Sequence, residues 1–330
     1  EADFIVASSD LKKWDERSPN TGANANARRT AEAAMEGYYN KNVKNPAAAQ
    51  YNVRAAYHVA KMKKSARSGD TNRWFERTMT AWGAWKNAAP RDGGKNTALG
   101  SPEAGMAAEA EYTMIDEELV KKFDYDSGFH RYKGTVTEVV KEYQNDAIEA
   151  KKWYDKLQRV VDEYVSPEWA PVAIARQGSV YDSLRTGLYN TRPPELKMFS
   201  AAQEKALKKA EESDNPDLQE KADAIRVTVQ QAWRKKRDTE LDSADRIVVD
   251  RYATSLLLAR RFNVSNPSVT RAIRRLAFLT DVIGEAKIKT FTDPVKDLNY
   301  TPGMFQRMRP GVVAAPKPDG MPAPLPVMIQ

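Results

Sequence analysis

Two histidines are the side chains of this chain best suited to bind a transition metal, and the sequence contains no cysteine. Neither His58 nor His130 has a second histidine at the spacing that zinc sites use. His58 stands among alanine and tyrosine residues of a predicted helix, where a histidine usually has a structural role. The composition excludes disulfides, thiolate metal sites and cysteine nucleophiles. We therefore expect neither a metal nor a cofactor.

Carboxylates are the next groups that could perform chemistry. The segment Asp124–Gly128 resembles the start of a calcium-binding loop, but the twelfth position of that loop is Thr135 rather than the required glutamate. Acidic pairs such as Glu117-Glu118 could in principle hold a cation. A di-iron bundle would need a histidine three residues after a glutamate, and neither histidine has one. These patterns predict no metal centre.

Motifs of nucleotide-binding and hydrolytic enzymes are absent from the sequence. The segment Gly93-Gly94-Lys95-Asn96-Thr97 lacks the first glycine of a phosphate-binding loop and follows no apolar strand. No serine elbow is present. We expect a protein without catalytic residues; a carboxylate or metal-dependent enzyme is the alternative that local motifs leave open.

Basic residues make nucleic-acid binding the main alternative function. The formal net charge is +7, and residues 234–237 form an unbroken basic run that would suit phosphates. Further arginines follow at Arg260, Arg261, Arg271, Arg274 and Arg275. Acidic residues intervene at Glu240, Asp242, Asp245 and Asp250. Because the two signs are interspersed over most of the chain, we expect solvated, salt-bridged helix faces instead.

One long amphipathic helix must organise the middle of the chain. Between Thr135 and Tyr164, apolar residues recur in alternating steps of three and four, which predicts a helix that packs against other helices. Thr135 and Glu138 have the spacing of a capping box, and Ser166-Pro167 ends the helix. At a rise of about 1.5 Å per residue it would be roughly 45 Å long, which is typical of a helical array.

Turn and capping residues divide most of the remaining chain into further helices. The patterns predict helices over 23–40, 45–69, 70–90, 101–123, 167–193, 195–212, 215–232, 243–262 and 266–284. Gly178 would cost its helix about 1 kcal/mol relative to alanine unless a neighbouring helix packs closely against it. Residues 287–291 are ambiguous between a helix end and an extended stretch. No run approaches the roughly 18 consecutive apolar residues of a membrane span.

Helix pairs joined by short turns indicate stacked helical hairpins. Residues 46–82, with a turn at Ser68-Gly69-Asp70, resemble one tetratricopeptide-repeat unit, and later helix pairs look like longer variants. The stretch 166–196 contains Ser166-Pro167-Glu168-Trp169-Ala170-Pro171 and Asn190-Thr191-Arg192-Pro193-Pro194. It resembles the C-terminal region of large periplasmic tetratricopeptide-repeat proteins of myxobacteria and their relatives, including proteins of gliding-motility machinery. This resemblance covers 104–293, although most hairpins lack the full consensus. It implies an all-α, degenerate solenoid of helical hairpins.

The C-terminal segment has a different character, because prolines alternate there with methionines and no packed helix can form. We expect an extended segment that docks on a neighbouring subunit, with a disordered tail as the alternative. Its candidate contacts are Pro316, Pro318, Pro322 and Pro324. The predicted organisation is therefore helical hairpins over 1–100, longer repeats over 101–293 and an extended tail over 294–330.

The sequence thus predicts a non-enzymatic scaffold that binds other proteins through a curved helical surface, with no small-molecule substrate. Arg176, Tyr181, Arg185 and Tyr189 are the candidate anchors, since arginine and tyrosine are enriched among binding hot spots. A place in the core or on a plain surface is the alternative for each of them. The resemblance implies a structural subunit of an extracytoplasmic assembly, in the periplasm or at the surface, of the motility type. The chain begins with Glu1 rather than methionine, which fits a mature form after removal of an N-terminal signal.

Overall fold

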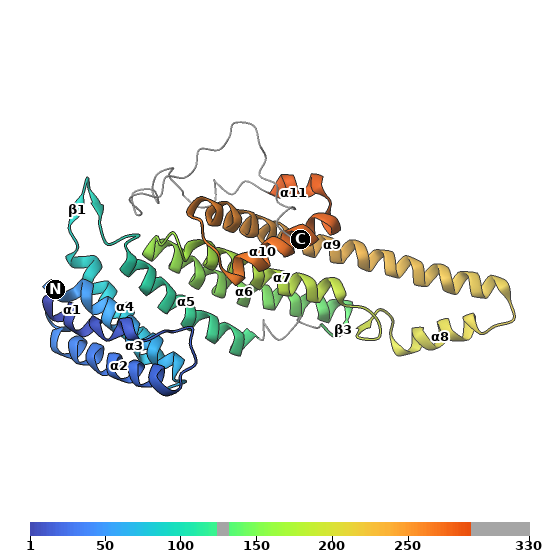
Figure 1. The fold of residues 1–330 in the computed structure, drawn as a ribbon. Coiled ribbons are helices and arrows are strands. Elements are labelled where there is room, and N and C mark those ends of the chain that lie inside the picture. The colour runs from blue at the N-terminus through green and yellow to red at the C-terminus, as the bar shows by residue number, and fades with distance from the viewer. Residues whose placement is uncertain (124–131, 292–330) are drawn as a thin grey trace.

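The structure, a computed structural model, describes residues 1–123 and 132–291. These residues are mostly helical, which confirms the predicted all-α class (Figure 1). Helices α1 to α5 span Ala2–Ser9, Gly22–Asn42, Ala49–Ser65, Thr71–Ala88 and Pro102–Phe123. Helices α6 to α11 span Val136–Tyr164, Ala170–Asn190, Ala201–Glu211, Pro216–Phe262, Pro267–Ile283 and Glu285–Phe291.

Two pairs of very short strands accompany these helices. Strands β1 (Arg91–Asp92) and β2 (Lys95–Asn96) form an antiparallel hairpin around Gly93-Gly94. Strands β3 (Gly134–Thr135) and β4 (Leu196–Lys197) pair in parallel, so they join the start of α6 to the segment after α7. The predicted tail, including Pro316, Pro318, Pro322 and Pro324, lies outside the described residues.

Helices α2 to α5 pack in the order in which they follow one another along the chain. Asn45 caps the turn before α3 by accepting a hydrogen bond from the backbone N–H of Ala47, as the Asn-Pro pattern predicts. The rings of Trp82 and Tyr164, 5.4 Å apart, connect α4 to the end of α6. One hydrophobic cluster continues from Phe4 to Phe291. The boundary predicted at residue 100 falls in a loop within that shared cluster, and the division into domains stays a prediction.

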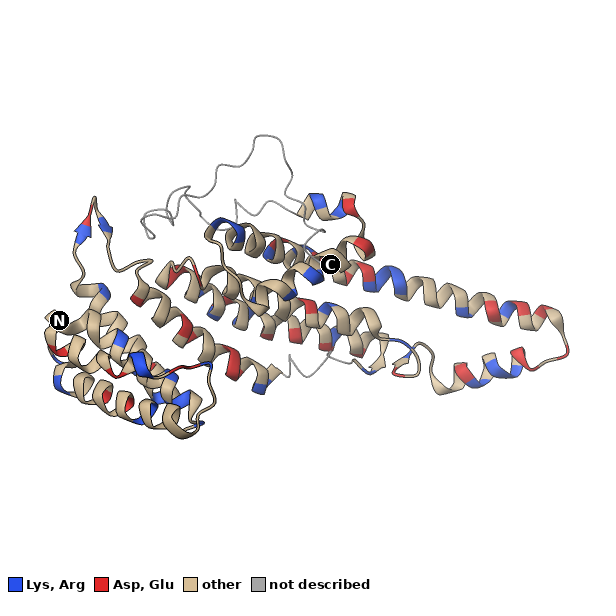
Figure 2. Cartoon of the chain, viewed as in Figure 1, with Lys and Arg blue, Asp and Glu red and all other residues tan. Residues whose placement is uncertain are grey.

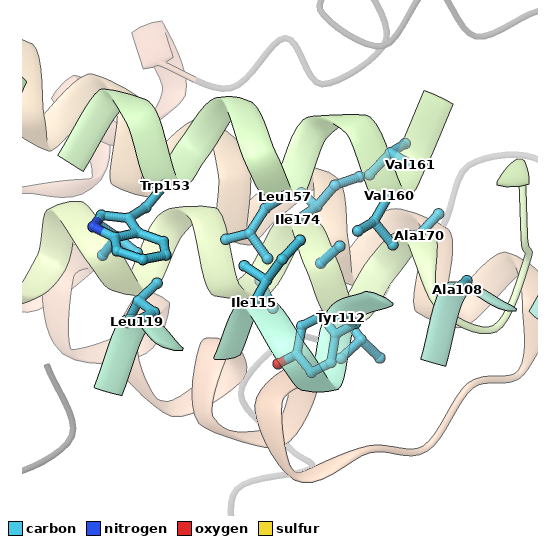
Figure 3. Packing of buried hydrophobic residues seen from close by; sticks show 14 of the residues in the cluster. Ala108, Tyr112, Ile115, Leu119, Trp153, Leu157, Val160, Val161, Ala170 and Ile174 are labelled. Atoms are coloured by element: carbon cyan, nitrogen blue, oxygen red, sulfur yellow. The ribbon is translucent and has the colours of Figure 1, made fainter. Parts of the chain in front are cut away.

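Helix α6 begins as its sequence predicts. The Thr135 hydroxyl accepts from the backbone N–H of Glu138 at 3.3 Å, and the Glu138 carboxylate accepts from the Thr135 N–H at 2.7 Å. Val165, with φ at 51°, adopts the left-handed conformation that ends the helix. Helix α6 packs on α5 and on α7. Figure 3 shows the buried side chains gathered among these three helices, which include Tyr112, Ile115, Leu119, Trp153, Leu157 and Ile174.

Helix α7 is the centre of the C-terminal half. Every residue from Ala170 to Leu188 is buried, because α6, α9 and α10 all pack on this helix. Gly178 permits the close approach of α9: a Cβ atom there would lie 2.8 Å from the Tyr252 ring. This contact is the close packing that the sequence required to offset a glycine inside a helix. A helix of a simple solenoid keeps one face exposed, so the enclosure of α7 distinguishes this half from such an array.

Helix α9 corrects one prediction of the sequence. Separate helices were expected over 215–232 and 243–262, but a single helix of 47 residues runs from Pro216 to Phe262. After Pro216 this segment contains no proline or glycine that could break it. The expected start at Ser243 is an exposed position within the helix, and its neighbours Leu241 and Ala244 are buried. The packing of these buried residues on the rest of the protein therefore stabilises a continuous helix where a break was expected.

The final described helix resolves the ambiguity at 287–291. Ile288 and Phe291 are buried, so α11 packs on α9 and α10 as a short helix. In the two described ranges, no helix has the combination of length and apolar character that crossing a membrane requires.

Candidate functional site

Three of the four predicted anchor residues lie in the interior of the chain. Arg176, Tyr181 and Arg185 are 5, 8 and 3% exposed, whereas Tyr189 is half-buried. The Arg176 Nε donates to Asp116 on α5 at 2.6 Å. The Tyr181 ring meets Tyr154 edge-on, with centroids 6.2 Å apart, and burial raises the pKa of Tyr181 to about 12. These contacts give Arg176 and Tyr181 the core position that the sequence left open as the alternative.

The structure brings Arg185 and Tyr189 together at the end of α7. Arg185 forms an ion pair with Asp245 of α9, and burial raises the pKa of that carboxyl group in spite of the nearby guanidinium. The guanidinium groups of Arg185 and Arg237 lie 5.3 and 4.7 Å from the centre of the Tyr189 ring. The side chains of the four anchor residues are engaged within this chain. That they bind a partner stays a prediction.

Asp182 is the single carboxylate of α7 and is buried, and the sequence analysis missed it. It accepts from the Tyr252 hydroxyl at 3.0 Å and from Nε and Nη2 of Arg275 at 2.6 and 2.7 Å. Asp182 is 6% exposed, so the bidentate pair with Arg275 is largely withdrawn from water. The site joins α7, α9 and α10. No local sequence pattern marks Asp182, because its partners Tyr252 and Arg275 are 70 and 93 residues away along the chain.

The basic residues of the nucleic-acid hypothesis are divided between different environments. Arg275 is bound to Asp182, and Arg237 lies against Tyr189 with a side chain 16% exposed. Arg234, Lys235 and Lys236 are exposed on α9. The described residues therefore present a local basic patch on α9 rather than one surface containing all the arginines of the sequence pattern.

His58 has the structural environment that its sequence context predicts. Burial, with added repulsion from Arg54 and Lys61, lowers the pKa of His58 to about 4. The imidazole is therefore neutral near pH 7. Within 1–123 and 132–291, no group of three or more His, Cys, Asp or Glu side chains is placed to hold a metal ion. His130 and the loop starting at Asp124 lie outside the described residues.

We expect His58 to reduce stability in mild acid. The unfolded chain takes up a proton near pH 6.5, whereas the folded chain does so only near pH 4. The free energy of unfolding is therefore unaffected by His58 above pH 6.5. As the pH falls from 6.5 toward 4, it decreases by up to about 1.4 kcal/mol per pH unit. Urea unfolding at several pH values, for the wild type and for His58→Gln, measures this difference. Identical pH dependence in the two proteins would contradict the assignment.

A projecting arm is the most distinctive surface of the structure. We define the arm as residues 201–236, which comprise α8 and the outer part of α9 (Figure 1). The two helices pack through Leu207 and Ala222, and Arg226 pairs with Glu204 at 2.8 Å and with Glu211. Leu207 and Ala222 are buried outside the main hydrophobic cluster, to which Trp233 belongs. The outer part of the arm thus packs mainly on itself.

Apolar side chains are exposed on this arm. Leu218, Ile225 and Val227 are 42, 48 and 50% exposed. A group of apolar residues along one side of an exposed helix, such as Leu218 and Ile225, marks a candidate surface for binding a partner. The spacing of Leu218, Ala222 and Ile225 in the sequence predicts one apolar stripe that packs on other helices. That expectation is wrong for Leu218 and Ile225, because among the described helices α8 alone lies beside the outer part of α9 (Figure 1).

Opposite charges occupy the two ends of the arm. Residues 234–237, next to the body, are all basic. The far end carries six carboxylates against the single Lys221 in residues 211–223 (Figure 2). These acidic residues are Glu211, Glu212, Asp214, Asp217, Glu220 and Asp223.

Comparisons with protein-family models, with characterised proteins and with solved structures find no match for this chain.

Proposed function

We propose that this protein is a non-enzymatic scaffold that binds other proteins and that the arm is its principal binding surface. The observation that carries this proposal is the arm itself, a helical hairpin that leaves Leu218 and Ile225 exposed on one side of α9. In the body, by contrast, the polar groups of α7 are largely engaged with neighbouring helices. A projecting hairpin on a closely packed body suits recognition of another surface rather than chemistry on a substrate.

The finer architecture is part of the same proposal. The sequential packing of α2 to α5 supports a tetratricopeptide-like arrangement for the N-terminal hairpins. The resemblance of residues 166–196 supports a structural role in an extracytoplasmic assembly, periplasmic or at the surface, of the motility type. Neighbouring subunits of that assembly would be its partners, and the tail from residue 294 would supply a second contact with them.

Removing the arm tests this function. Replacement of residues 201–229 by a short Gly-Ser linker keeps Trp233 in the main cluster and removes the exposed apolar residues. We expect the variant to lose proteins that copurify with the wild type from its native cells, because the arm binds them. We also expect the melting temperature of the body to change by less than about 3 °C, since the outer arm adds little to the shared core.

A second variant separates the binding surface from the arm as a structural element. Leu218→Ser combined with Ile225→Ser keeps both helices and removes two exposed apolar side chains. It should lose the same copurifying proteins while retaining the helical circular dichroism of the wild type. Retention of every one of these proteins by the linker variant would show that the arm is not the binding surface.

A further inference from the structure

We propose that the partner of the arm is the arm of a second copy of this chain, bound antiparallel to form a four-helix bundle. This inference rests on the proposed function, because it names the partner for the same surface. Three observations on the described residues carry it: a stripe of exposed apolar residues, small residues on the adjacent helix, and charges of opposite sign at the two ends.

The apolar stripe has the spacing of a helix seam. Leu218, Ile225 and Ala232 are seven residues apart on α9, so they lie along one side of the helix. All three are exposed. They are next to the buried side of α9, since the buried Ala222 is three residues before Ile225 and the buried Trp233 follows Ala232. The stripe therefore flanks the existing contact between the two helices, as the seams of a four-helix bundle do.

Helix α8 adds small residues to this surface. Ala202, Ala206 and Ala210 are four residues apart and share one side of α8; the first two are exposed and the third is half-buried. Alanines allow the backbones of two helices to approach closely. A two-helix hairpin that buries only a few large side chains is weakly stabilised by itself. Pairing two hairpins would cover the Leu218, Ile225 and Ala232 stripe of each.

The charges of the arm select an antiparallel pair. A two-fold axis at Ile225 places the acidic turn of each copy, with Glu212 and Asp214, beside Lys235 and Lys236 of the other. Leu218 then lies opposite Ala232, a large residue against a small one. A parallel pair would place acidic ends together and basic ends together, which costs free energy through like-charge repulsion. The interface is isologous, so it closes at two copies rather than propagating.

The mass of the full-length chain in solution, measured by analytical ultracentrifugation over a range of concentrations, tests the proposal. We expect a monomer–dimer equilibrium that Ile225→Glu weakens at least about tenfold in Kd, because two carboxylates would meet at the axis. Val227→Glu is the matched control. Val227 lies on the same helix as Ile225 and is nearly as exposed. It points about 200° away from Ile225 around the helix axis, so Val227→Glu should leave the dimer intact.

Charge reversal tests the orientation. Lys235→Glu with Lys236→Glu should weaken the dimer, and so should Glu212→Lys with Asp214→Lys. All four changes together should restore it, since both ends then exchange sign. The chain has no cysteine, so Asn215→Cys provides a unique site for a spin label. Antiparallel arms separate the two labels by about 30 Å, whereas parallel arms would bring them within about 15 Å.

The outcomes distinguish this inference from the function on which it rests. A chain that remains monomeric at all concentrations, or a dimer that Ile225→Glu and Val227→Glu affect equally, would overturn the self-pairing. If the arm then still retains another protein that the linker variant loses, the scaffold function stands with a different partner. Labels within about 15 Å of each other would overturn the antiparallel arrangement.

Discussion

Replacement of Asp182 by alanine is expected to lower the free energy of unfolding by about 3–5 kcal/mol. The carboxylate accepts three hydrogen bonds from Tyr252 and Arg275 at 2.6–3.0 Å, and it is 6% exposed. Its removal leaves a guanidinium with a side chain only 25% exposed facing an apolar methyl group. Chemical unfolding monitored by circular dichroism measures the loss.

The double variant separates the ion pair from simple loss of packing. Arg275→Ala combined with Asp182→Ala removes both charges, so we expect it to be less destabilising than the sum of the two single variants. Asp155→Ala is the control, because Asp155 and Lys151 form an exposed pair on α6, which contributes only about 0.5 kcal/mol. Equal losses for Asp182→Ala and Asp155→Ala would show that burial does not strengthen the Asp182 contacts.

Gly178→Ala is expected to destabilise the protein, although alanine has the higher helix propensity. Alanine favours a helix interior by about 1 kcal/mol over glycine. At Gly178, however, the added Cβ would lie 2.8 Å from the Tyr252 ring and 3.3 Å from the Arg251 Cβ. The ring is 1% exposed and its hydroxyl is bonded to Asp182, so it has little room to move. We expect a net destabilisation of about 1–3 kcal/mol.

Gly37→Ala provides the matched comparison for this prediction. Gly37 lies inside α2, and a Cβ atom there would have no neighbour within 4 Å. Here the propensity term acts alone, so alanine should stabilise the protein by about 0.5–1 kcal/mol. Thermal unfolding of the two variants should therefore give shifts of opposite sign. If both variants had a higher melting temperature than the wild type, α7 and α9 could move apart at a small cost in free energy, which would contradict the prediction.

Local features of the fold could be predicted because neighbouring residues determine them. The capping box of Thr135 and Glu138, and the Asn-Pro starts at Asn215 and Asn266, each involve backbone groups within three residues. The long helix between Thr135 and Tyr164 followed from its apolar spacing for the same reason. Gly178 was a conditional prediction, and the ring of Tyr252 supplies the required close contact.

The remaining features depend on contacts between distant parts of the chain. Asp182 and Arg275 are 93 residues apart, and no local pattern distinguishes them from solvated charges. Arg176 and Arg185 were candidate anchors of a binding surface because arginine is enriched among hot spots, with a core position as the alternative, and the structure pairs each with a carboxylate on another helix. The exposed side of the arm was missed for the converse reason. An apolar stripe predicts that something covers it but does not identify what does.

The unbroken course of α9 makes the arm a lever. The helix is roughly 70 Å long at about 1.5 Å per residue, with no proline or glycine hinge between Asp217 and Phe262. Its inner part holds Tyr252 against Gly178 and Asp182. A pull or twist on the tip therefore cannot be absorbed by a joint near the body. The load passes along the helix to Trp233 and Leu241, where α9 first joins the main hydrophobic cluster, and from there to the contact between α7 and α9.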